Sequence, residues 1–379
     1  MKRVLKRVLW LLVLLVLLAA VGGALFVNLA PQFGESPRGP YLERVQASPH
    51  YADGQFVNLV ETRMDLGFRG GLESLWEFFT AQHTVPEVPL PVRPGLAGTH
   101  EAVPTAPLYL TWFGHSAILL ELEGKRLLLD PMLGPAASPV SFSVQRFPYE
   151  RALMLDSLAP VDAIFFSHDH YDHLDYPSVM ALKEKTGHFF VPMGVGSHLR
   201  RWGIPDEKIT ELDWWESRAY AGLQVTLTPA RHFSGRGLTD RNKTLWGSWA
   251  IRGQRTNVYF SGDSGYGDHF REIGERLGPF DLAMMECGQY NEKWKAIHMM
   301  PEQTLQAGLD VGGKRLMPIH WGAFALAVHP WTDPVERLTA AARERGFTEL
   351  MTPVIGQRLT LEEPTSPWWE PLRAAEREE

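Results

Sequence analysis

The stretch at residues 167–175, SHDHYDHLD, determines how the rest of the chain is interpreted. It follows the apolar run 163–166, so its polar residues begin where a predicted strand ends. Three histidines and three aspartates lie in this stretch, and no lysine or arginine accompanies them. Imidazole and carboxylate groups are ligands that Zn²⁺ accepts, and a tight loop directs them to one place. The stretch therefore predicts a metal-binding loop of the form HxHxDH.

Further candidate ligands follow other predicted strands. His232 comes after the run 225–228, Asp263 follows the run 258–261, and His320 follows the run 315–319. A site for two metal ions needs more ligands than one loop supplies, and strand ends are where we expect them. The candidate metal ligands are therefore His168, His170, Asp172, His173, His232, Asp263 and His320.

The sequence from residue 108 onward has the texture of a mixed α/β domain. Short apolar runs alternate with Gly, Pro and Asp turns, and helical periodicity appears between them. We expect this domain to span residues 108–362 and to be followed by a mobile tail, 363–379. Strands are predicted at 108–113, 117–122, 126–129, 163–167, 225–228, 258–261 and 315–319, and helices at 177–186, 268–277, 301–311 and 333–346.

The amino terminus predicts a membrane segment within residues 1–30. Four basic residues at positions 2, 3, 6 and 7 precede an uncharged run at 8–27, which is long enough to span about 30 Å as a helix. Two interpretations remain: a signal peptide cleaved near the small residues at 19–24, or an uncleaved signal anchor, which the length of the run favours. Because the basic residues precede the run, we expect the rest of the chain to be exported, to the periplasmic face if the source is bacterial.

Residues 31–107 are rich in Pro and Gly and are interpreted as a connecting region. Within it, Leu72, Leu75, Trp76 and Phe79 have the spacing of one short amphipathic helix. Docking of this helix on the main domain is favoured over a role at the membrane surface, because apolar stripes usually face a core.

The composition excludes several classes of protein. The chain has 379 residues, of which 45% are hydrophobic and 21% charged, which is not the profile of a disordered or polytopic membrane protein. The net charge of −7 gives no reason to expect a nucleic-acid partner. Cys287 is the one cysteine, which excludes an intrachain disulfide and a cysteine-rich zinc finger. Histidine must therefore supply any metal site.

Taken together, the HxHxDH loop and the later His, Gly-Asp and His resemble the metallo-β-lactamase superfamily. That resemblance implies a four-layer αββα sandwich with a two-metal site at one edge. Over residues 108–348 the chain more closely resembles the N-acylphosphatidylethanolamine-hydrolysing phospholipase D family. The matching segments are WFGHS at 112–116, LDP at 129–131, RF at 146–147, HYDHLDY at 170–176, LDWWE at 212–216, LWGSW at 245–249 and IHWG at 319–322.

The resemblance implies two zinc ions per chain. His168, His170 and His232 would bind one ion, and Asp172, His173 and His320 the other, with Asp263 shared between them. His298, in the segment 297–302, matches a family active-site histidine near the substrate phosphate, although a core histidine is the alternative. Asp130 is interpreted as a residue that holds a ligand imidazole. The segment 286–291, ECGQYN, replaces an apolar Gly-Ala-Tyr-like stretch of the family, so the preferred head group is left open.

The function implied is hydrolysis of an N-acylphosphatidylethanolamine-like phospholipid to N-acylethanolamine and phosphatidic acid at a membrane. Two zinc ions lower the pKa of a bridging water, and the resulting hydroxide attacks phosphorus, with Asp172 and His298 as the candidate catalytic residues. A lactonase or a general phosphodiesterase of the same superfamily is the alternative enzyme. A non-catalytic envelope protein is the alternative outside catalysis. The sequence leaves the oligomeric state open.

Overall fold

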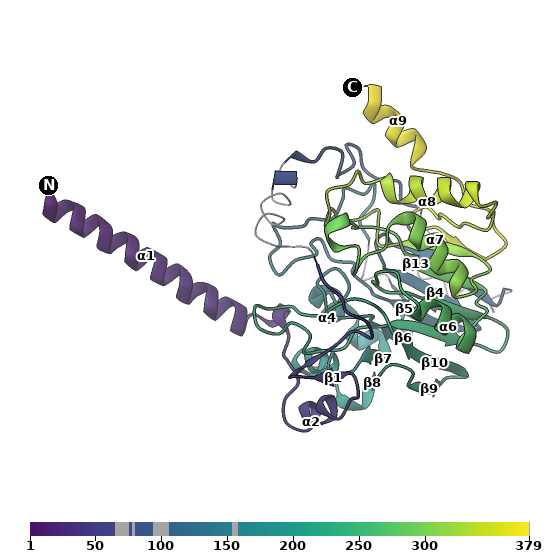
Figure 1. Ribbon diagram of the computed structural model, residues 1–379, viewed down its shortest axis with the longest axis horizontal. Helices are drawn as coiled ribbons and strands as arrows, with labels where there is room; N and C mark the ends of the chain where they lie inside the picture. Colours follow the sequence, from purple (N-terminus) through teal and green to yellow (C-terminus); the bar gives the residue numbers. More distant parts are fainter. Residues whose placement is uncertain (65–75, 78–79, 94–105, 154–157, 379) are drawn as a thin grey trace.

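The computed structural model describes residues 1–64, 76–77, 80–93, 106–153 and 158–378 (Figure 1). Of the predicted amphipathic helix, Leu72, Leu75 and Phe79 lie outside the described residues. Trp76 is in a helical turn, and its side chain is 71% exposed.

Two mixed sheets form the centre of the body. The first sheet runs antiparallel from β15 to β5 and parallel from β5 to β8. Its strands, in spatial order, are β15 (Arg358–Leu359), β3 (Leu108–Trp112), β4 (Ile118–Leu122), β5 (Lys125–Leu129), β6 (Val161–Phe165), β7 (Thr186–Pro192) and β8 (Ile209–Leu212).

The second sheet has a similar division into parallel and antiparallel parts. Its first three strands are parallel, and the remaining pairs are antiparallel. In spatial order they are β14 (Leu316–Ile319), β13 (Leu282–Glu286), β12 (Asn257–Phe260), β11 (Ser248–Arg252), β10 (Leu223–Thr228) and β9 (Ser217–Tyr220).

The main hydrophobic core lies between the two sheets. Side chains alternate along each strand, so Leu127 and Leu129 of β5 join this core while Leu128 joins a second cluster on the outer face. The core combines residues of both sheets, such as Phe165 and Trp249, whose rings are 5.4 Å apart. The outer face of each sheet also carries apolar side chains that must be shielded from water. Helices are therefore needed on both sides of the two packed sheets.

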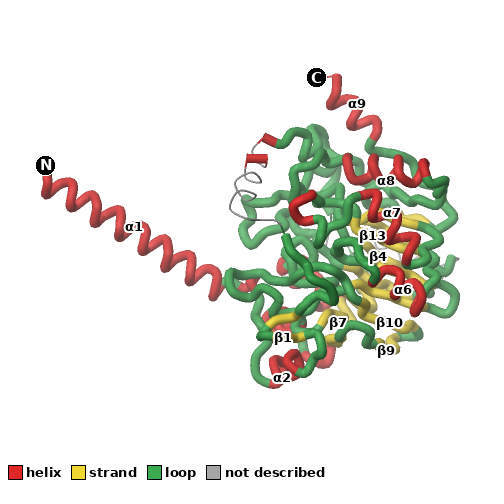
Figure 2. The backbone as a smooth tube through the Cα atoms, viewed as in Figure 1, coloured by secondary structure: helices red, strands yellow, loops and turns green. Residues whose placement is uncertain are grey.

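Helices cover both outer faces. On the first sheet these are α4 (Tyr176–Leu182) and α5 (Gly196–Arg201), which contribute Val179 and Leu199 to the outer cluster. On the second sheet they are α6 (His269–Leu277), α7 (Pro301–Asp310) and α8 (Asp333–Glu344). Figure 2 shows the red helices α6, α7 and α8 beside the yellow strands. The arrangement is an αββα sandwich, which confirms the predicted fold class. Single-turn helices are η3 (Lys183–Lys185), η4 (Asp206–Lys208) and η5 (Glu292–Trp294).

All seven predicted strands are present, with ends within two residues of those expected. The sequence analysis did not predict β7, β8, β9, β11, β13 or the short β15. It also expected a mobile tail after Leu361, whereas Trp368 and Trp369 are buried there and Trp368 stacks on Trp321 at 5.5 Å. These aromatic side chains hold the segment that precedes α9 (Glu370–Glu378) against the core.

The amino-terminal helix α1 (Lys2–Leu29) projects from the body (Figure 1). None of its residues is buried, and it is long and apolar enough to cross a membrane by length and composition. After it come η1 (Pro31–Phe33), α2 (Pro40–Gln46), β1 (Tyr51–Ala52) and β2 (Gln55–Phe56).

The segment after α1 packs on the sandwich, although the sequence analysis treated it only as a connection. Ser48 Oγ donates a hydrogen bond of 2.6 Å to Asp213, and Phe56 is fully buried in the main core. Asn58 pairs with the backbone of His232 through two hydrogen bonds, of 2.8 and 3.1 Å. This segment therefore fixes the position of one candidate metal ligand.

Candidate metal centre

The candidate site lies where strands of both sheets end at the same edge of the sandwich. In the first sheet, Asp130 follows β5, and the HxHxDH loop follows the neighbouring parallel strand β6. In the second sheet, Asp263 follows β12, Glu286 ends β13, and His320 follows β14. Because parallel neighbours end at the same edge, the sheet order brings side chains from distant parts of the sequence together.

One group of ring nitrogens is formed by His168, His170 and His232. His170 Nδ1 lies 2.9 Å from His168 Nε2 and 3.3 Å from His232 Nε2. Candidate ligand atoms of these residues all lie within 4.8 Å of one another.

A second group contains Asp172, His173 and His320. Asp172 Oδ2 lies 3.1 Å from His320 Nε2 and 3.4 Å from His173 Nε2. The structure thus brings together both sets of three residues that the sequence analysis predicted.

Asp263 lies between the two groups. Its Oδ2 atom is 3.1 Å from His320 Nε2 and 3.2 Å from His173 Nε2. The same oxygen is 3.9 Å from His168 Nε2 and 3.8 Å from His232 Nε2. One carboxylate is therefore within reach of both groups.

The outer ring nitrogens of three candidate ligands face groups that accept hydrogen bonds. His232 Nδ1 is 3.1 Å from the Ile297 carbonyl, and His320 Nδ1 is 3.3 Å from the Gly288 carbonyl. His173 Nδ1 is 2.7 Å from Asp130 Oδ2. A carbonyl or carboxylate oxygen accepts only, so in the neutral form of each ring, the form that binds a cation, Nδ1 carries the proton and Nε2 presents a lone pair.

Asp130 and Ser167 extend this arrangement to His168. The Ser167 N–H and Oγ–H both donate to Asp130, at 2.7 and 2.5 Å. Since the single hydroxyl proton of Ser167 is used there, its oxygen accepts from His168 Nδ1 at 2.9 Å. His168 Nε2 is thereby also left with a lone pair toward the site.

The donor set fits divalent cations. Four Nε2 lone pairs and two carboxylates converge, an arrangement that is repulsive unless positive charge lies among them. Two buried atoms facing the site, His173 Nε2 and Asp263 Oδ1, have no hydrogen-bond partner. Imidazole nitrogens with carboxylate oxygens are a ligand set suited to Zn²⁺ and its neighbours in the transition series.

The pKa values follow from the same crowding of charge. Burial lowers the pKa of His173, but the carboxylates of Asp263, Asp172 and Asp130 outweigh it and raise that pKa well above its ordinary value. Burial raises the pKa values of Asp172 and Asp263, yet the surrounding imidazoles hold both well below the usual range. The two carboxylates are therefore ionised at neutral pH.

His115 joins the second group, although the sequence analysis gave it no role beyond a matching motif. Its Nε2 atom lies 2.9 Å from Asp172 Oδ2. Burial and the nearby His320 lower its pKa to about 3, so the ring is neutral and its Nε2–H donates to the carboxylate. In the sequence, the position of this histidine in a Gly-His turn directly after a predicted strand could have identified it as a candidate.

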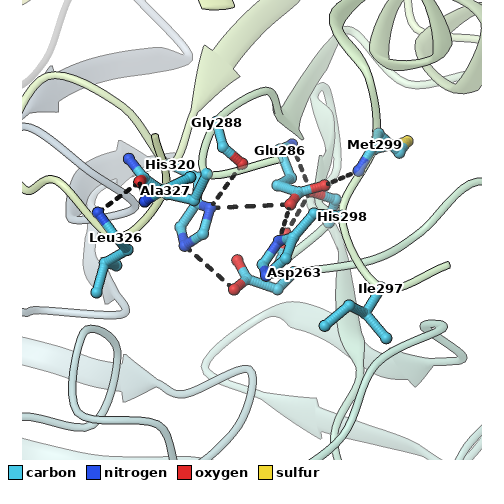
Figure 3. A network of polar contacts seen from close by, with 12 residues as sticks. Asp263, Glu286, Gly288, Ile297, His298, Met299, His320, Leu326 and Ala327 are labelled. Carbon is cyan, nitrogen blue, oxygen red and sulfur yellow. Dashed lines mark hydrogen bonds and ion pairs between the residues drawn. The ribbon is translucent and has the colours of Figure 1, made fainter. Parts of the chain in front are cut away.

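His298 lies beside the cluster, with its ring 5.1 Å from that of His232 and 5.2 Å from that of His320. Figure 3 shows it between Asp263 and Glu286. Burial lowers its pKa, which the Asp263 and Asp172 carboxylates oppose. A pocket of about 280 Å³ opens beside these residues and is lined by Met64, His170, Asp172, Phe233, Asp263, Gln289, Trp294, Ile297, His298, His320 and Leu326.

Comparison with known proteins gives a consistent family assignment. A family model described as a beta-lactamase superfamily domain matches residues 125–321. An uncharacterised protein of Mycobacterium tuberculosis is 44% identical over 336 residues, which cover 86% of this chain and 88% of the relative. N-acyl-phosphatidylethanolamine-hydrolyzing phospholipase D 1 of Caenorhabditis elegans is 34% identical over 66% of this chain and 75% of its own length.

A solved structure supports the fold. A metallo hydrolase from the archaeon Ignicoccus hospitalis has a TM-score of 0.52 and 22% identity. The match covers 66% of this chain and 97% of that one.

Proposed function

The chain belongs to the beta-lactamase superfamily and is a metal-dependent hydrolase, and from this premise we propose that it is a zinc-dependent phosphodiesterase acting on N-acylphosphatidylethanolamine-like lipids. The products would be N-acylethanolamine and phosphatidic acid. The observation that carries the proposal is a candidate metal cluster that opens into a pocket with a partly apolar wall. The similarity to a nematode enzyme named for this reaction supports the choice of substrate.

The residues divide into two sets of ligands in this proposal. His168, His170 and His232 would hold one zinc ion, Asp172, His173 and His320 would hold the other, and Asp263 is within reach of both sets. When bound, two zinc ions supply activation of water and stabilisation of negative charge on the phosphoryl oxygens. Asp130 and Ser167 keep the ligand rings oriented.

The pocket wall suits a lipid with a phosphodiester. Met64, Phe233, Trp294, Ile297 and Leu326 present apolar side chains beside the histidines and aspartates. Acyl or alkyl chains lose contact with water when they bind to such a wall, at about 25 cal/mol per Å² of apolar surface buried.

We assign His298 to proton transfer. The hydrolysed P–O bond releases an alkoxide, which needs a proton, and Nε2 is the ring nitrogen of His298 that its other contacts leave available. An anionic phosphodiester beside this ring favours its protonated form. It therefore raises the pKa of His298, which burial lowers.

The proposed membrane association rests on α1 and on the hydrogen bonds that attach the residues directly after α1 to the body. Trp202 Nε1 donates to the Pro31 carbonyl at 2.7 Å, and Arg236 donates to the Gln32 carbonyl at 2.7 Å. Gln32 Nε2 in turn donates to the Pro139 carbonyl at 2.9 Å. A membrane helix fixed in this way would keep the enzyme next to a lipid substrate, with the body on the exported side as the basic residues before the run predict.

The test is a comparison of substrates with the full chain loaded with zinc. N-acylphosphatidylethanolamine, an aryl phosphodiester and a lactone are supplied in parallel at equal concentrations. We expect the lipid to be hydrolysed with the highest kcat/KM. Preferred hydrolysis of the lactone would instead assign the chain to a different reaction of the superfamily.

A second test separates anchoring from catalysis. Removal of residues 1–30 should lower turnover of lipid in vesicles much more than turnover of the soluble aryl diester, with metal content unchanged. Equal losses on both substrates would indicate damaged folding, and no loss on either would leave α1 as an export signal only.

A further inference from the structure

Glu286 is a buried carboxylate that the predicted metal site does not use. It is the last residue of β13 and is completely inaccessible to solvent. The neighbouring parallel strands place Asp263 and His320 on either side of it at the same edge. Burying a carboxylate is costly unless hydrogen bonds compensate, so its partners indicate why it is there.

Two polar groups of one neighbouring segment converge on this side chain. Oε1 is hydrogen bonded to His298 Nδ1, and Oε2 accepts from the Met299 N–H at 3.0 Å (Figure 3). His320 Nδ1 is farther from Oε1, at 3.8 Å, and its proton points to the Gly288 carbonyl. Glu286 therefore binds two consecutive residues of the segment that carries His298.

The contacts determine which face of the His298 ring is available. With Nδ1 engaged by Glu286, Nε2 is the nitrogen left for a ligand in the pocket that His298 lines. With the proton of this pair on His298 Nδ1, as in an imidazolium ring, a glutamine at position 286 cannot reproduce the arrangement, because its NH₂ group would meet either the Met299 N–H or the His298 Nδ1–H.

From this geometry we infer that Glu286 is a positioning residue, which holds His298 so that its Nε2–H protonates the departing alkoxide. The inference rests on the proposed phosphodiesterase function. In that step the oxygen of water bonds to phosphorus, the bond from phosphorus to the alkoxide oxygen breaks, and the alkoxide takes the proton from Nε2. The proton released by the water returns to the ring through solvent, so the step balances.

The leaving group provides a test that separates positioning from structural support. A nitrophenolate leaves without a proton, whereas an alkoxide requires one. We therefore compare an alkyl phosphodiester and a nitrophenyl phosphodiester with the full chain in detergent micelles, and measure zinc content for every variant. Glu286→Gln should lower kcat for the alkyl substrate about 10- to 100-fold, and change KM, zinc content and nitrophenyl turnover less than about threefold.

The double variant is the second arm of the test. If Glu286 acts through His298, Glu286→Gln added to His298→Ala should cause no further loss of alkyl turnover. Cys287→Ala is the matched control. Cys287 is the next residue along the chain, but it packs under α6, α7 and α8 on the outer face of the second sheet, so its substitution should leave both rates unchanged. Should Glu286→Gln not fold, Glu286→Asp retracts the carboxylate by one methylene and should show the same selective loss to a smaller degree.

Three results would overturn the inference: equal losses for both leaving groups, additive losses in the double variant, or loss of zinc in Glu286→Gln. The last result would mean that Glu286 supports His320 instead. A wild-type chain without activity on any phosphodiester would refute the proposed function, whereas an active wild-type chain with additive losses would refute this inference alone.

Discussion

The two sheets contribute to the candidate site in different ways. The first sheet supplies His168, His170, Asp172 and His173 from one loop, supported by Asp130 at the end of the adjacent strand. The second sheet supplies single residues from the ends of successive parallel strands, including Asp263 and His320. We call the residues from the first sheet the first half of the site and those from the second sheet the second half. The first half comes from one short stretch of sequence, whereas the second half depends on the order of the strands. We therefore expect different consequences when each half is altered.

The largest effect is expected for Asp263→Ala in the second half. This carboxylate approaches both groups of ring nitrogens, so its loss should lower zinc content from the proposed two ions per chain to one or fewer. Turnover should fall about a thousandfold, because several kcal/mol of charge stabilisation are lost and each 1.36 kcal/mol is a factor of ten. Elemental analysis and kinetics measure both quantities.

The matched control for this change is Asp268→Ala, an aspartate nearby in the chain whose side chain is 97% exposed. It should retain wild-type zinc and turnover. Full zinc occupancy in Asp263→Ala would contradict the shared position of this carboxylate.

Asp172→Asn removes the same charge from the first half. An amide oxygen is a weaker ligand than a carboxylate, but the loop keeps its histidines and their outer hydrogen bonds. We expect a loss of turnover of about a hundredfold with normal folding by circular dichroism. Unchanged turnover would remove Asp172 from the catalytic residues, and a loss larger than that of Asp263→Ala would reverse the comparison of the two halves.

Asp130→Asn tests the hydrogen bonds that orient the ligands of the first half, rather than the ligands themselves. The asparagine NH₂ group would face either the Ser167 N–H, in place of Oδ1, or both the Ser167 hydroxyl and His173 Nδ1–H, in place of Oδ2, so at least one hydrogen bond must be lost. Zinc affinity or activity should fall about 10- to 100-fold. Zinc titration of the purified variant measures this, and a variant with wild-type affinity and activity would show that the support is not needed.

Ser167→Ala is expected to have the smallest effect. It removes the acceptor for His168 Nδ1 and one donor to Asp130, while the backbone bond between residues 167 and 130 remains. We expect a loss of stability of about 1–3 kcal/mol and a severalfold decrease in zinc affinity. Thermal denaturation and zinc titration check these values. A larger decrease in zinc affinity than that of Asp130→Asn would mean that Ser167, rather than Asp130, is the main residue that orients the ligand rings.

Local patterns in the sequence predict the HxHxDH part of the site and the class of fold. The loop is local, because residues within one turn after a strand stay together whatever the rest of the chain does. The later candidates His232, Asp263 and His320 were recognisable because each follows an apolar run, and all three lie in the cluster. The long apolar run at the amino terminus likewise forms the helix α1.

The further side chains that face this cluster are brought there by the packing of the two sheets. Glu286 ends β13, a strand that was not predicted from the sequence, and it lies between Asp263 and His320 because β13 lies between β12 and β14. His115 approaches Asp172 from the turn between β3 and β4, two strands away from β6 in the same sheet, and Asn58 fixes His232 from a segment interpreted as a connection. These contacts depend on strand order and chain packing between residues far apart in sequence, which local patterns of polarity do not encode.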